Sequence, residues 1–596
     1  MKHLLKAKTF LAVLLQHPFD LSSVAGAQKE FSVALNDFSD IDHTQQFVPG
    51  VSAFLPVYGN KVHAALHLVP LAMELSRAGL VGCDVLRLLM MRLHSSLSAQ
   101  SQNITMADFT FITQHLQDVQ ASINSAINEA DQLAPVDLRF DPHLGALVDV
   151  LHKDLSMLHL WSDRIVRILP VVPMLLGIDT SANYLLEVLD STELRPGGGF
   201  IGNYGIATFT GARLVATHIT DTSLLDHAFS AARLTNLFPV AYSWFDIVPK
   251  YNWGLRDSNL DADFPTVARY AESLYTREGG NIPLQGVIAI TPTFIQNALT
   301  ITGPIYLPEY HETINAHNLV ERIHYHQLGP RTEGPGTVAS PDGYSSQRKH
   351  FTALLAERFF SRVCQSASSN VAKFLLLVVN GIRTKDLQIY LNNSRVEALF
   401  HQDHLDAAIQ TESGDGIFVV DANIAGNKAN SVIVNTLADT VTIDAAGNAT
   451  HLTQLRYSWT IPEQYSRPIY RDYIRVYVPR GSMLLTQKGW KLRSNSNDFG
   501  HEVWAGFFSL RYGQTRTITL TWRVPHVATH DQYGWHYQDM IQRQAGAVWT
   551  FKVHVTLPPC TIRVNRSVGM KLLGKQAATA SQSLTENTHM VIDYRC

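Results

Sequence analysis

The chain contains little cysteine for its length. Only four cysteines occur among 596 residues, and none has the C-x-x-C spacing of a zinc or thiol redox motif. Cys560 and Cys596 both lie close to the C-terminus, so a disulfide formed in an oxidising compartment and a pair of free thiols stand as alternatives. A disulfide-rich fold and a cysteine-ligated zinc centre are excluded.

The chain also has no large excess of positive or negative charge. Charged residues make up 17% of the chain, and the formal net charge is −3. Without blocks of like charge, the sequence offers no electrostatic footprint for nucleic acid and no polybasic patch for a membrane. Hydrophobic residues make up 46%, which indicates a globular protein whose length allows three or four domains.

Long hydrophobic runs are missing too. The longest, TFLAVLLQ, ILPVVPMLLGI and KFLLLVVNGI, fall short of the roughly 20 residues that a membrane helix needs. Residues 1–40 begin with Lys2, Lys6 and Lys8 ahead of the first run, which is typical of a signal peptide or an anchor remnant. We expect membrane association only if this segment is retained or an anchor lies upstream, and a cytoplasmic location if it is no targeting signal.

Motifs of familiar reactions do not occur either. G-K-[ST], G-x-S-x-G and H-E-x-x-H are absent, and Ser346 and Lys349 match S-x-x-K without the S-D-N and K-T-G that should follow. Four histidines lie close together in the sequence without a neighbouring cysteine, which does not favour a metal site: His311, His317, His324 and His326.

Hydrophobic periodicity divides the chain into zones. Residues 41–172 place apolar side chains at three- and four-residue spacing, which predicts a helical bundle or stalk. Residues 173–385 alternate strand and helix signals and predict an α/β domain with a mixed sheet, interrupted by a Gly- and Pro-rich loop at 329–345. Residues 386–596 carry short strands and turns typical of a β-sandwich. The expected fold class is multidomain α+β.

The stretch ELRPGGGFIGNYG, residues 193–205, is unusually rich in glycine. Gly197, Gly199 and Gly202 spell G-x-G-x-x-G, the pattern of a dinucleotide-binding turn. That turn requires a helix after the glycines, whereas GIATFTGARLVATHIT alternates as a β-hairpin does. NAD and FAD are therefore not expected. The glycines indicate a tight turn or close backbone packing, with an anion-binding nest beside Arg195 as the alternative.

A second polar stretch, YNWGLRDSNLDADFP, precedes a predicted helix. Its plainer interpretation is a helix entry capped by Asp263. The alternative is a carboxylate cluster for a divalent cation or for acid–base chemistry, which would include Asp257 beside Arg256. The pattern lacks the glycine and the final glutamate of a calcium-binding loop.

Several stretches in order resemble the bacterial domain-of-unknown-function family 4012. The resemblance covers roughly residues 165–560 and is carried by NYLLEVLDSTELRPGGGFIGNYGI, NLDADFPTVARYAESLY, LQGVIAITPTFIQNALTITGPI and VVDANIAGNKANSVI. It implies an extracytoplasmic body, typically behind an N-terminal anchor, with no established activity. Leu260 and Ala262 stand where the family more often has Trp and Pro, which weakens an active site there.

A fainter resemblance links the same region to the LytR-CpsA-Psr phosphotransferases, although their diagnostic SIPRD is absent. It implies pyrophosphate and Mg²⁺ contacts, with Arg195, Arg256, Asp257 and Asp263 as catalytic candidates, of which Asp257 and Asp263 are also the metal-binding candidates. The ligand-binding candidates are Glu193, Arg195, Gly199 and Asn259.

The leading hypothesis is an extracytoplasmic, cell-envelope-associated protein that binds or scaffolds an envelope component or polymer. The first alternative is a metal-assisted phosphotransferase that handles pyrophosphate-linked glycopolymers. The second is carbohydrate or peptide binding by the β-sandwich, through aromatic side chains that would have to be exposed: Trp504, Tyr533, Trp535 and Tyr537.

Overall fold

The structure is a computed structural model. It describes residues 2–14, 20–45, 59–96, 104–133, 155, 157–160, 162–163, 165–231, 236–246, 252–328, 350–364, 370–411, 414–462 and 469–596. Part of the expected helical zone, the expected loop at 329–345 and the pair Ser346 and Lys349 lie outside these residues.

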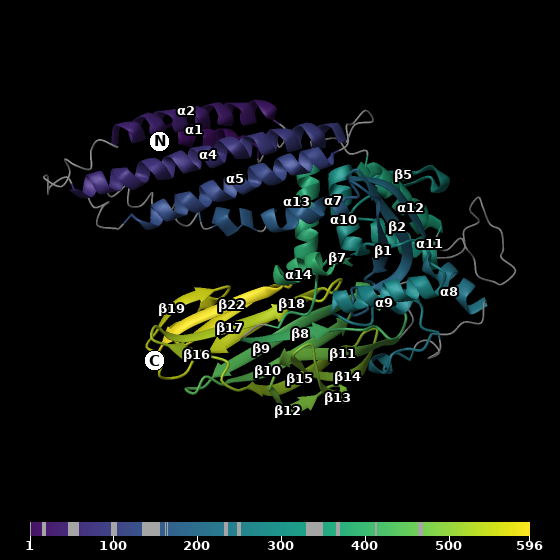
Figure 1. The fold of residues 1–596 in the computed structure, drawn as a ribbon. Coiled ribbons are helices and arrows are strands. Elements are labelled where there is room, and N and C mark those ends of the chain that lie inside the picture. Colours follow the sequence, from purple (N-terminus) through teal and green to yellow (C-terminus); the bar gives the residue numbers. More distant parts are fainter. Residues whose placement is uncertain are drawn as a thin grey trace. The chain divides into compact units, whose positions relative to one another are not determined.

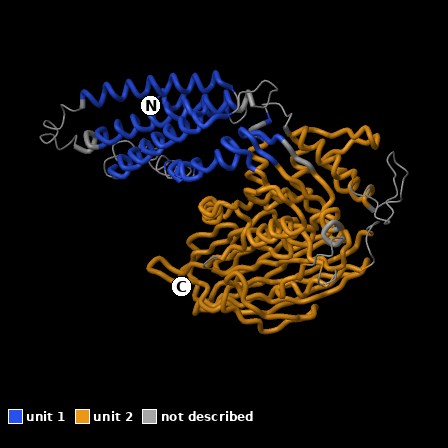
Figure 2. The backbone as a smooth tube through the Cα atoms, turned by 45° about the vertical axis from the view of Figure 1, so that its right-hand side comes forward, with its two compact units in different colours: residues 1–182, 208–215, 364–373 blue, residues 183–207, 216–363, 374–596 orange. Residues whose placement is uncertain are grey.

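The chain divides into two compact units, coloured separately in Figure 2. Unit 1 comprises residues 1–182, 208–215 and 364–373. Unit 2 comprises residues 183–207, 216–363 and 374–596. Unit 2 thus combines most of the central α/β region with all of the strand-rich C-terminal region.

Unit 1 is built from long amphipathic helices. They are α1 (Lys2–Val13), α2 (Leu21–Gln45), α4 (Gly59–Ser96) and α5 (Met106–Asp131), followed by the short α7 (Val172–Leu175). Residues 1–40 form α1 and most of α2, and Ala7 and Phe31 from these helices share an apolar core with Cys83 of α4. The stretch Ala64–Arg92 of α4 is long and apolar enough to cross a membrane by length and composition alone, although polar residues interrupt its apolar runs.

A five-stranded mixed sheet forms the centre of unit 2. Its order is β3-β2-β1-β4-β7, with β4 parallel to β1 and antiparallel to β7. The strands are β1 (Ala182–Asp190), β2 (Phe200–Thr210), β3 (Arg213–Asp221), β4 (Gly286–Ile290) and β7 (Leu387–Leu391). This confirms the mixed sheet, and the expected hairpin is β2–β3, whose turn residues Gly211 and Ala212 both have positive φ.

Helices accompany the sheet in chain order. The described ones are α8 (Thr222–Ala231), α9 (Phe264–Arg277), α10 (Pro292–Thr302), α11 (Leu319–Leu328), α12 (His350–Cys364), α13 (Val371–Arg383) and α14 (Ser394–Gln402), with a small ladder of β5 (Ile305–Leu307) and β6 (Glu312–Ile314). The apolar face of α9 presents Phe264, Val267 and Ala271 to the same core as Leu185 of β1 and Val287 of β4.

The C-terminal region is a β-sandwich, as expected. An eight-stranded sheet is joined in the order β13-β14-β11-β8-β17-β22-β19, with β16 paired to β17, and a seven-stranded sheet in the order β12-β15-β10-β9-β18-β21-β20 (Figure 1). Both sheets contribute to one apolar core, for example Ile474 and Ile592 from the first and Leu437 and Val553 from the second. Cys560 and Cys596 are joined in a disulfide.

The strands of the sandwich are β8 (Asp415–Val420), β9 (Ile433–Ile443), β10 (Ala449–Trp459), β11 (Ile469–Pro479), β12 (Met483–Lys488), β13 (Lys491–Asp498), β14 (His501–Arg511), β15 (Thr515–Val524), β16 (Thr529–Asp531), β17 (Gly534–Gln542), β18 (Trp549–Thr556), β19 (Arg563–Val568), β20 (Lys571–Leu572), β21 (Ala577–Ser583) and β22 (Thr588–Arg595).

Glu187 in the middle of β1 is fully buried, and neither of its carboxylate oxygens has a hydrogen-bond partner among the described residues. Burial raises the pKa of Glu187 to about 8. The carboxyl is therefore neutral in the folded protein at a pH at which the unfolded chain has already ionised it. The stability that depends on this proton is complete below pH 4.5 and is lost as the pH rises towards 8.

We predict that Glu187→Gln raises the melting temperature at pH 8 by more than it does at pH 5. Between pH 5 and pH 8, the free energy of unfolding of the wild type should fall relative to that of the variant by up to ~1.4 kcal/mol per pH unit. Only the wild type has a buried carboxyl at this position that must keep its proton on folding. Thermal unfolding of both proteins across this pH range measures the difference. Glu309→Gln, at an exposed ion pair with Arg358, is the control. An equal change at both pH values would contradict the prediction.

Candidate functional site

The glycine-rich stretch forms a corner between β1 and β2, here called the β1–β2 corner (residues 191–199). Strand β2 begins at Phe200 directly after the glycines, so no helix follows them. Gly199 has a φ of 152°, and a Cβ atom there would lie 2.5 Å from the backbone carbon of Asp190. A close backbone approach therefore requires this glycine. The geometry agrees with the expectation of a tight turn in place of a dinucleotide cradle.

Arg195 is buried inside this corner and is only 2% exposed. Its guanidinium donates to a carboxylate oxygen of Glu193 at 2.8 Å and to the carbonyl oxygen of Asn423 at 2.6 Å. The positive charge is therefore already matched within the protein, in surroundings that exclude solvent.

Lys428 completes the charge balance of the corner. Its ammonium lies 2.8 Å from a carboxylate oxygen of Asp190 and 3.0 Å from Glu193. Burial alone would lower the pKa of Lys428, but the two carboxylates raise it above its usual range. Burial would likewise raise the pKa of Asp190, but Lys428 holds it well below the usual range. Lys428 and Asp190 are therefore both ionised at neutral pH.

Hydrogen bonds to backbone atoms of the corner attach it to the sandwich. Gln544, just after β17, donates to the carbonyl oxygen of Arg195 at 3.1 Å. The amide N–H of Leu194 donates to the side chain of Asn430 at 3.2 Å, and the N–H of Asn423 donates to the Leu194 carbonyl at 3.0 Å. The corner thus fastens the central sheet to the sandwich within unit 2.

The second polar stretch is also occupied by structural contacts. Arg256 pairs with Asp226 at 3.1 Å and with the buried Asp257 at 3.2 Å. Asn259 donates to the carbonyl oxygen of Gly199. Asp263 is the N-cap of α9 and accepts from the Thr266 N–H at 3.1 Å, as the plainer interpretation predicted.

The structure brings Arg195 and Asp257 close enough to interact electrostatically, but both are buried and neither lines either cavity. Of the residues proposed from the sequence, only Asp263 lines either of the two cavities described here. Within the described ranges, no three His, Cys, Asp or Glu side chains are placed to hold a metal ion. Of the histidines near α11, His324 bonds to Thr192 at 2.9 Å and His326 to Glu312 at 3.2 Å.

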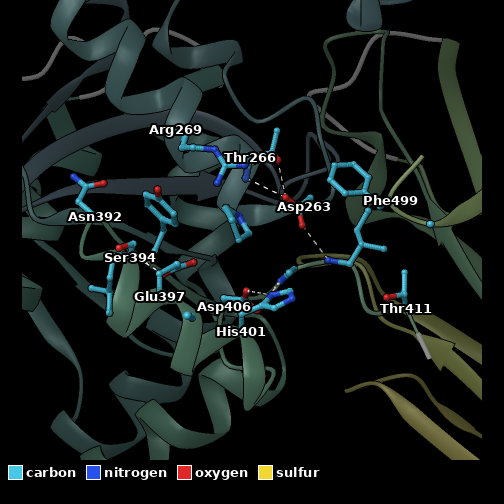
Figure 3. Close-up of a pocket in the computed structure, with 17 residues that line it drawn as sticks. Asp263, Thr266, Arg269, Asn392, Ser394, Glu397, His401, Asp406, Thr411 and Phe499 are labelled. Carbon is cyan, nitrogen blue, oxygen red and sulfur yellow. Dashed lines mark hydrogen bonds and ion pairs between the residues drawn. The ribbon is translucent and has the colours of Figure 1, made fainter. Parts of the chain in front are cut away.

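A cleft of about 750 Å³ lies beside Asp263 (Figure 3). Its walls come from the first turns of α9, the end of β7 with α14, the segment 406–411, and the two-residue turn between β13 and β14. The side chains on these walls that can bond or stack with a ligand are Thr266, Arg269, Tyr390, Asn392, Ser394, Glu397, His401, Thr411 and Phe499. We call this cavity the α9–α14 cleft.

Glu397 is the most perturbed acid on the cleft wall. One of its carboxylate oxygens accepts from the Leu391 N–H at 2.9 Å, and the other is buried without a hydrogen-bond partner. Burial raises the pKa of Glu397 to about 7. Near neutral pH this side chain can therefore donate or accept a hydrogen bond.

His401 lies one turn further along α14 than Glu397. Its Nδ1 atom bonds to the buried carboxylate of Asp406 at 2.7 Å. Because that bond orients the imidazole, its Nε2 atom is available to a ligand in the cleft. Burial also raises the pKa of Asp263, although Thr266 and the backbone of Ile409 donate to its carboxylate.

Backbone strain gathers around the cleft. Phe499, whose ring lines it, has a φ of 46°, and Ala407 and His404 in the adjoining segment have values of 54° and 57°. Left-handed backbone at residues other than glycine is unfavourable and often marks functional sites. Phe499 also packs against the apolar cluster around Ile409 and Tyr477, which helps to hold it there.

Residues 179–327 match the model of the family described as Protein of unknown function (DUF4012). This part of the chain is similar to the DUF4012 family. The likeness to LytR-CpsA-Psr phosphotransferases is not shown by the comparisons. No curated protein matches the chain. The DUF4012 segment contains the β1–β2 corner, so the glycine signature corresponds to a structural joint.

Solved structures offer only distant likenesses. A candidate nutrient-binding protein of Legionella pneumophila aligns at 10% identity and a TM-score of 0.23, over 30% of this chain and 71% of that one. The M1 zinc metallopeptidase of Deinococcus radiodurans aligns at 12% identity and a TM-score of 0.17, over 27% of this chain and 42% of the peptidase. TM-scores this low indicate no common overall fold.

The sequence does not predict most of the cleft residues that lie outside the DUF4012 segment. Tyr390, Glu397 and His401 lie in a strand end and a helix with no motif spacing, so only tertiary packing reveals them. The expected sandwich aromatics do not form a patch: Trp504 and Tyr537 are fully buried, Trp535 is partly buried, and Tyr533 is 64% exposed.

We predict that Lys428→Met lowers the free energy of unfolding by about 3–5 kcal/mol, because it leaves Asp190 without its cation and Glu193 paired with Arg195 alone. Urea denaturation measures the change. The control is Arg471→Met, which removes an exposed pair with Asp246 and should change stability by less than ~1 kcal/mol. Equal effects of the two substitutions would refute a structural role for the buried charges.

Proposed function

We propose that this protein binds a hydroxyl-rich ligand, an oligosaccharide of the cell envelope, in the α9–α14 cleft. The observation that carries the proposal is the composition of this cavity. About 750 Å³ of space is lined by two aromatic rings, a glutamate whose pKa is raised to about 7, and short polar side chains. Ligand-binding cavities commonly have volumes of roughly 300–1,000 Å³.

Sugar hydroxyls both donate and accept hydrogen bonds. Ser394 and Thr411 offer groups of both kinds, Asn392 offers its side-chain oxygen because its amide nitrogen already donates to Glu272 and Leu284, and Glu397 can donate or accept near neutral pH. The guanidinium carbon of Arg269 lies over the Tyr390 ring, 5.9 Å from the centre of the ring. This contact helps to hold the ring in place as a flat apolar surface. Aromatic rings provide the apolar surface that the C–H face of a sugar needs.

The envelope location is supported by two observations. The Cys560–Cys596 disulfide is typical of proteins that fold in oxidising compartments. The family resemblance also implies an extracytoplasmic body. The phosphotransferase alternative has less support, because Arg195 and Asp257 are buried and each forms an ion pair within the protein, Arg195 with Glu193 and Asp257 with Arg256.

We predict that Tyr390→Ala weakens oligosaccharide binding about tenfold, by removing the flat surface beneath the sugar. Titration calorimetry with chitotetraose, cellotetraose, maltotetraose and methyl-esterified tetragalacturonate measures binding to both proteins. Tyr306→Ala, at an exposed tyrosine outside the cleft, is the control and should bind as the wild type does. The proposal fails if none of the four sugars binds, or if Tyr390→Ala binds them as well as the wild type.

We also predict that affinity for the bound sugar rises between pH 6 and pH 8. Glu397, whose pKa is about 7, becomes a carboxylate over this range, and a sugar hydroxyl donates more strongly to a charged acceptor. Glu397→Gln should lack this rise because its amide does not titrate. His401→Gln tests whether the imidazole contributes. A rise of equal size in Glu397→Gln would rule out the carboxyl as its source.

A further inference from the structure

A second cavity of about 440 Å³ adjoins the α9–α14 cleft. It lies at one end of the sandwich, where the ends of β11, β14, β15 and β17 come together. Both cavities are lined by Thr411 and Gly500. They therefore flank the same small region of surface, and a ligand longer than one sugar ring could occupy both.

The turn between β13 and β14 forms the boundary of the two cavities. Phe499 lines the first, Gly500 lines both, and His501 lines the second. A Cβ atom on Gly500 would lie 2.8 Å from the methyl carbon of Thr411. Gly500 thus packs closely against Thr411, and these two residues form the part of the wall that both cavities share.

The second cavity differs from the first in charge. No aspartate or glutamate lines it, whereas Arg480 does. Arg480 is exposed and has no ion-pair partner within the described part of the chain. His536, also on the wall, is already matched by Asp531 at 3.0 Å and Asp593 at 2.9 Å. The uncompensated charge of this cavity is therefore the arginine.

Two histidines add hydrogen-bonding groups beside Arg480. The Nδ1–H of His501 donates to the carbonyl oxygen of Phe499 at 2.9 Å, and burial lowers the pKa of this imidazole. Because the ring is neutral with its proton on Nδ1, Nε2 can accept from a hydroxyl. His526 is held in left-handed backbone with a φ of 50°, and its N–H donates to Asn448 at 3.0 Å. Strained backbone therefore occurs at the second cavity as well.

We propose that the second cavity is the anion subsite of one elongated groove, and that the ligand is an acidic oligosaccharide. Its carboxylate pairs with Arg480 while a neighbouring sugar ring stacks on Tyr390 in the α9–α14 cleft. The inference rests on the proposed function, because it names the substrate class of the same binding site. Arginine suits this role, since its planar guanidinium can bond both oxygens of a carboxylate.

The test compares tetragalacturonate with its methyl ester, which has the same sugar chain without charge. Calorimetry at pH 8 should show the acid binding the wild type about tenfold more tightly than the ester does. Arg480→Gln should remove this preference and leave affinity for the ester unchanged. Tyr390→Ala should weaken both ligands equally. Arg516→Gln, at an exposed arginine outside both cavities, should retain the preference.

The outcomes separate this inference from the proposed function. Equal affinity for acid and ester, or a preference that survives in Arg480→Gln, overturns the anion subsite while binding in the cleft stands. If neither tetragalacturonate nor its methyl ester binds, and the neutral tetrasaccharides do not bind either, the proposed function and the anion subsite are both overturned. Competition by inorganic phosphate but not by acetate would overturn the carboxylate assignment in favour of a phosphate-bearing glycan.

Discussion

The buried ion pairs of the β1–β2 corner are the constraint on which the arrangement of unit 2 depends. Asp190, Glu193, Arg195 and Lys428 are largely removed from water, and their mutual pairing offsets much of the desolvation. Glu193 and Arg195 belong to the corner and Asp190 ends β1, whereas Lys428 belongs to the sandwich region. Neither part can bury these charges alone, so the sheet and the sandwich must pack together at this point.

That packing also creates the α9–α14 cleft. One wall consists of helices that cover the central sheet, and the other is the β13–β14 turn of the sandwich. A binding site at the junction of two substructures needs walls that stay at a fixed separation, because a small displacement would alter every ligand contact. The hydrogen bonds and ion pairs of the corner hold the central sheet against the sandwich, and strained backbone at Phe499 and Ala407 lies at or beside the cleft wall.

Some of the expectations drawn from single stretches agree with the structure because their cause is local. The alternation after Gly205 requires a hairpin, and β2 and β3 form it. Asp263 precedes a helix and caps it. By contrast, the sequence does not decide the surroundings of Arg195 and Asp257. A charged residue near glycines gives the same sequence pattern whether its side chain faces a cavity or pairs with an opposite charge in the interior.

The sequence by itself determined the helical, mixed and strand-rich zones, since periodicity over a few turns or strands decides which face of an element is apolar. The tertiary structure alone decided which polar residues are buried and which line a cavity. Glu193 and Arg195 pair with each other locally, but a second partner of Glu193 is 235 residues away in the chain and a second partner of Arg195 is 228 residues away. No local pattern encodes such a pairing, because it depends on how distant strands are brought together in three dimensions.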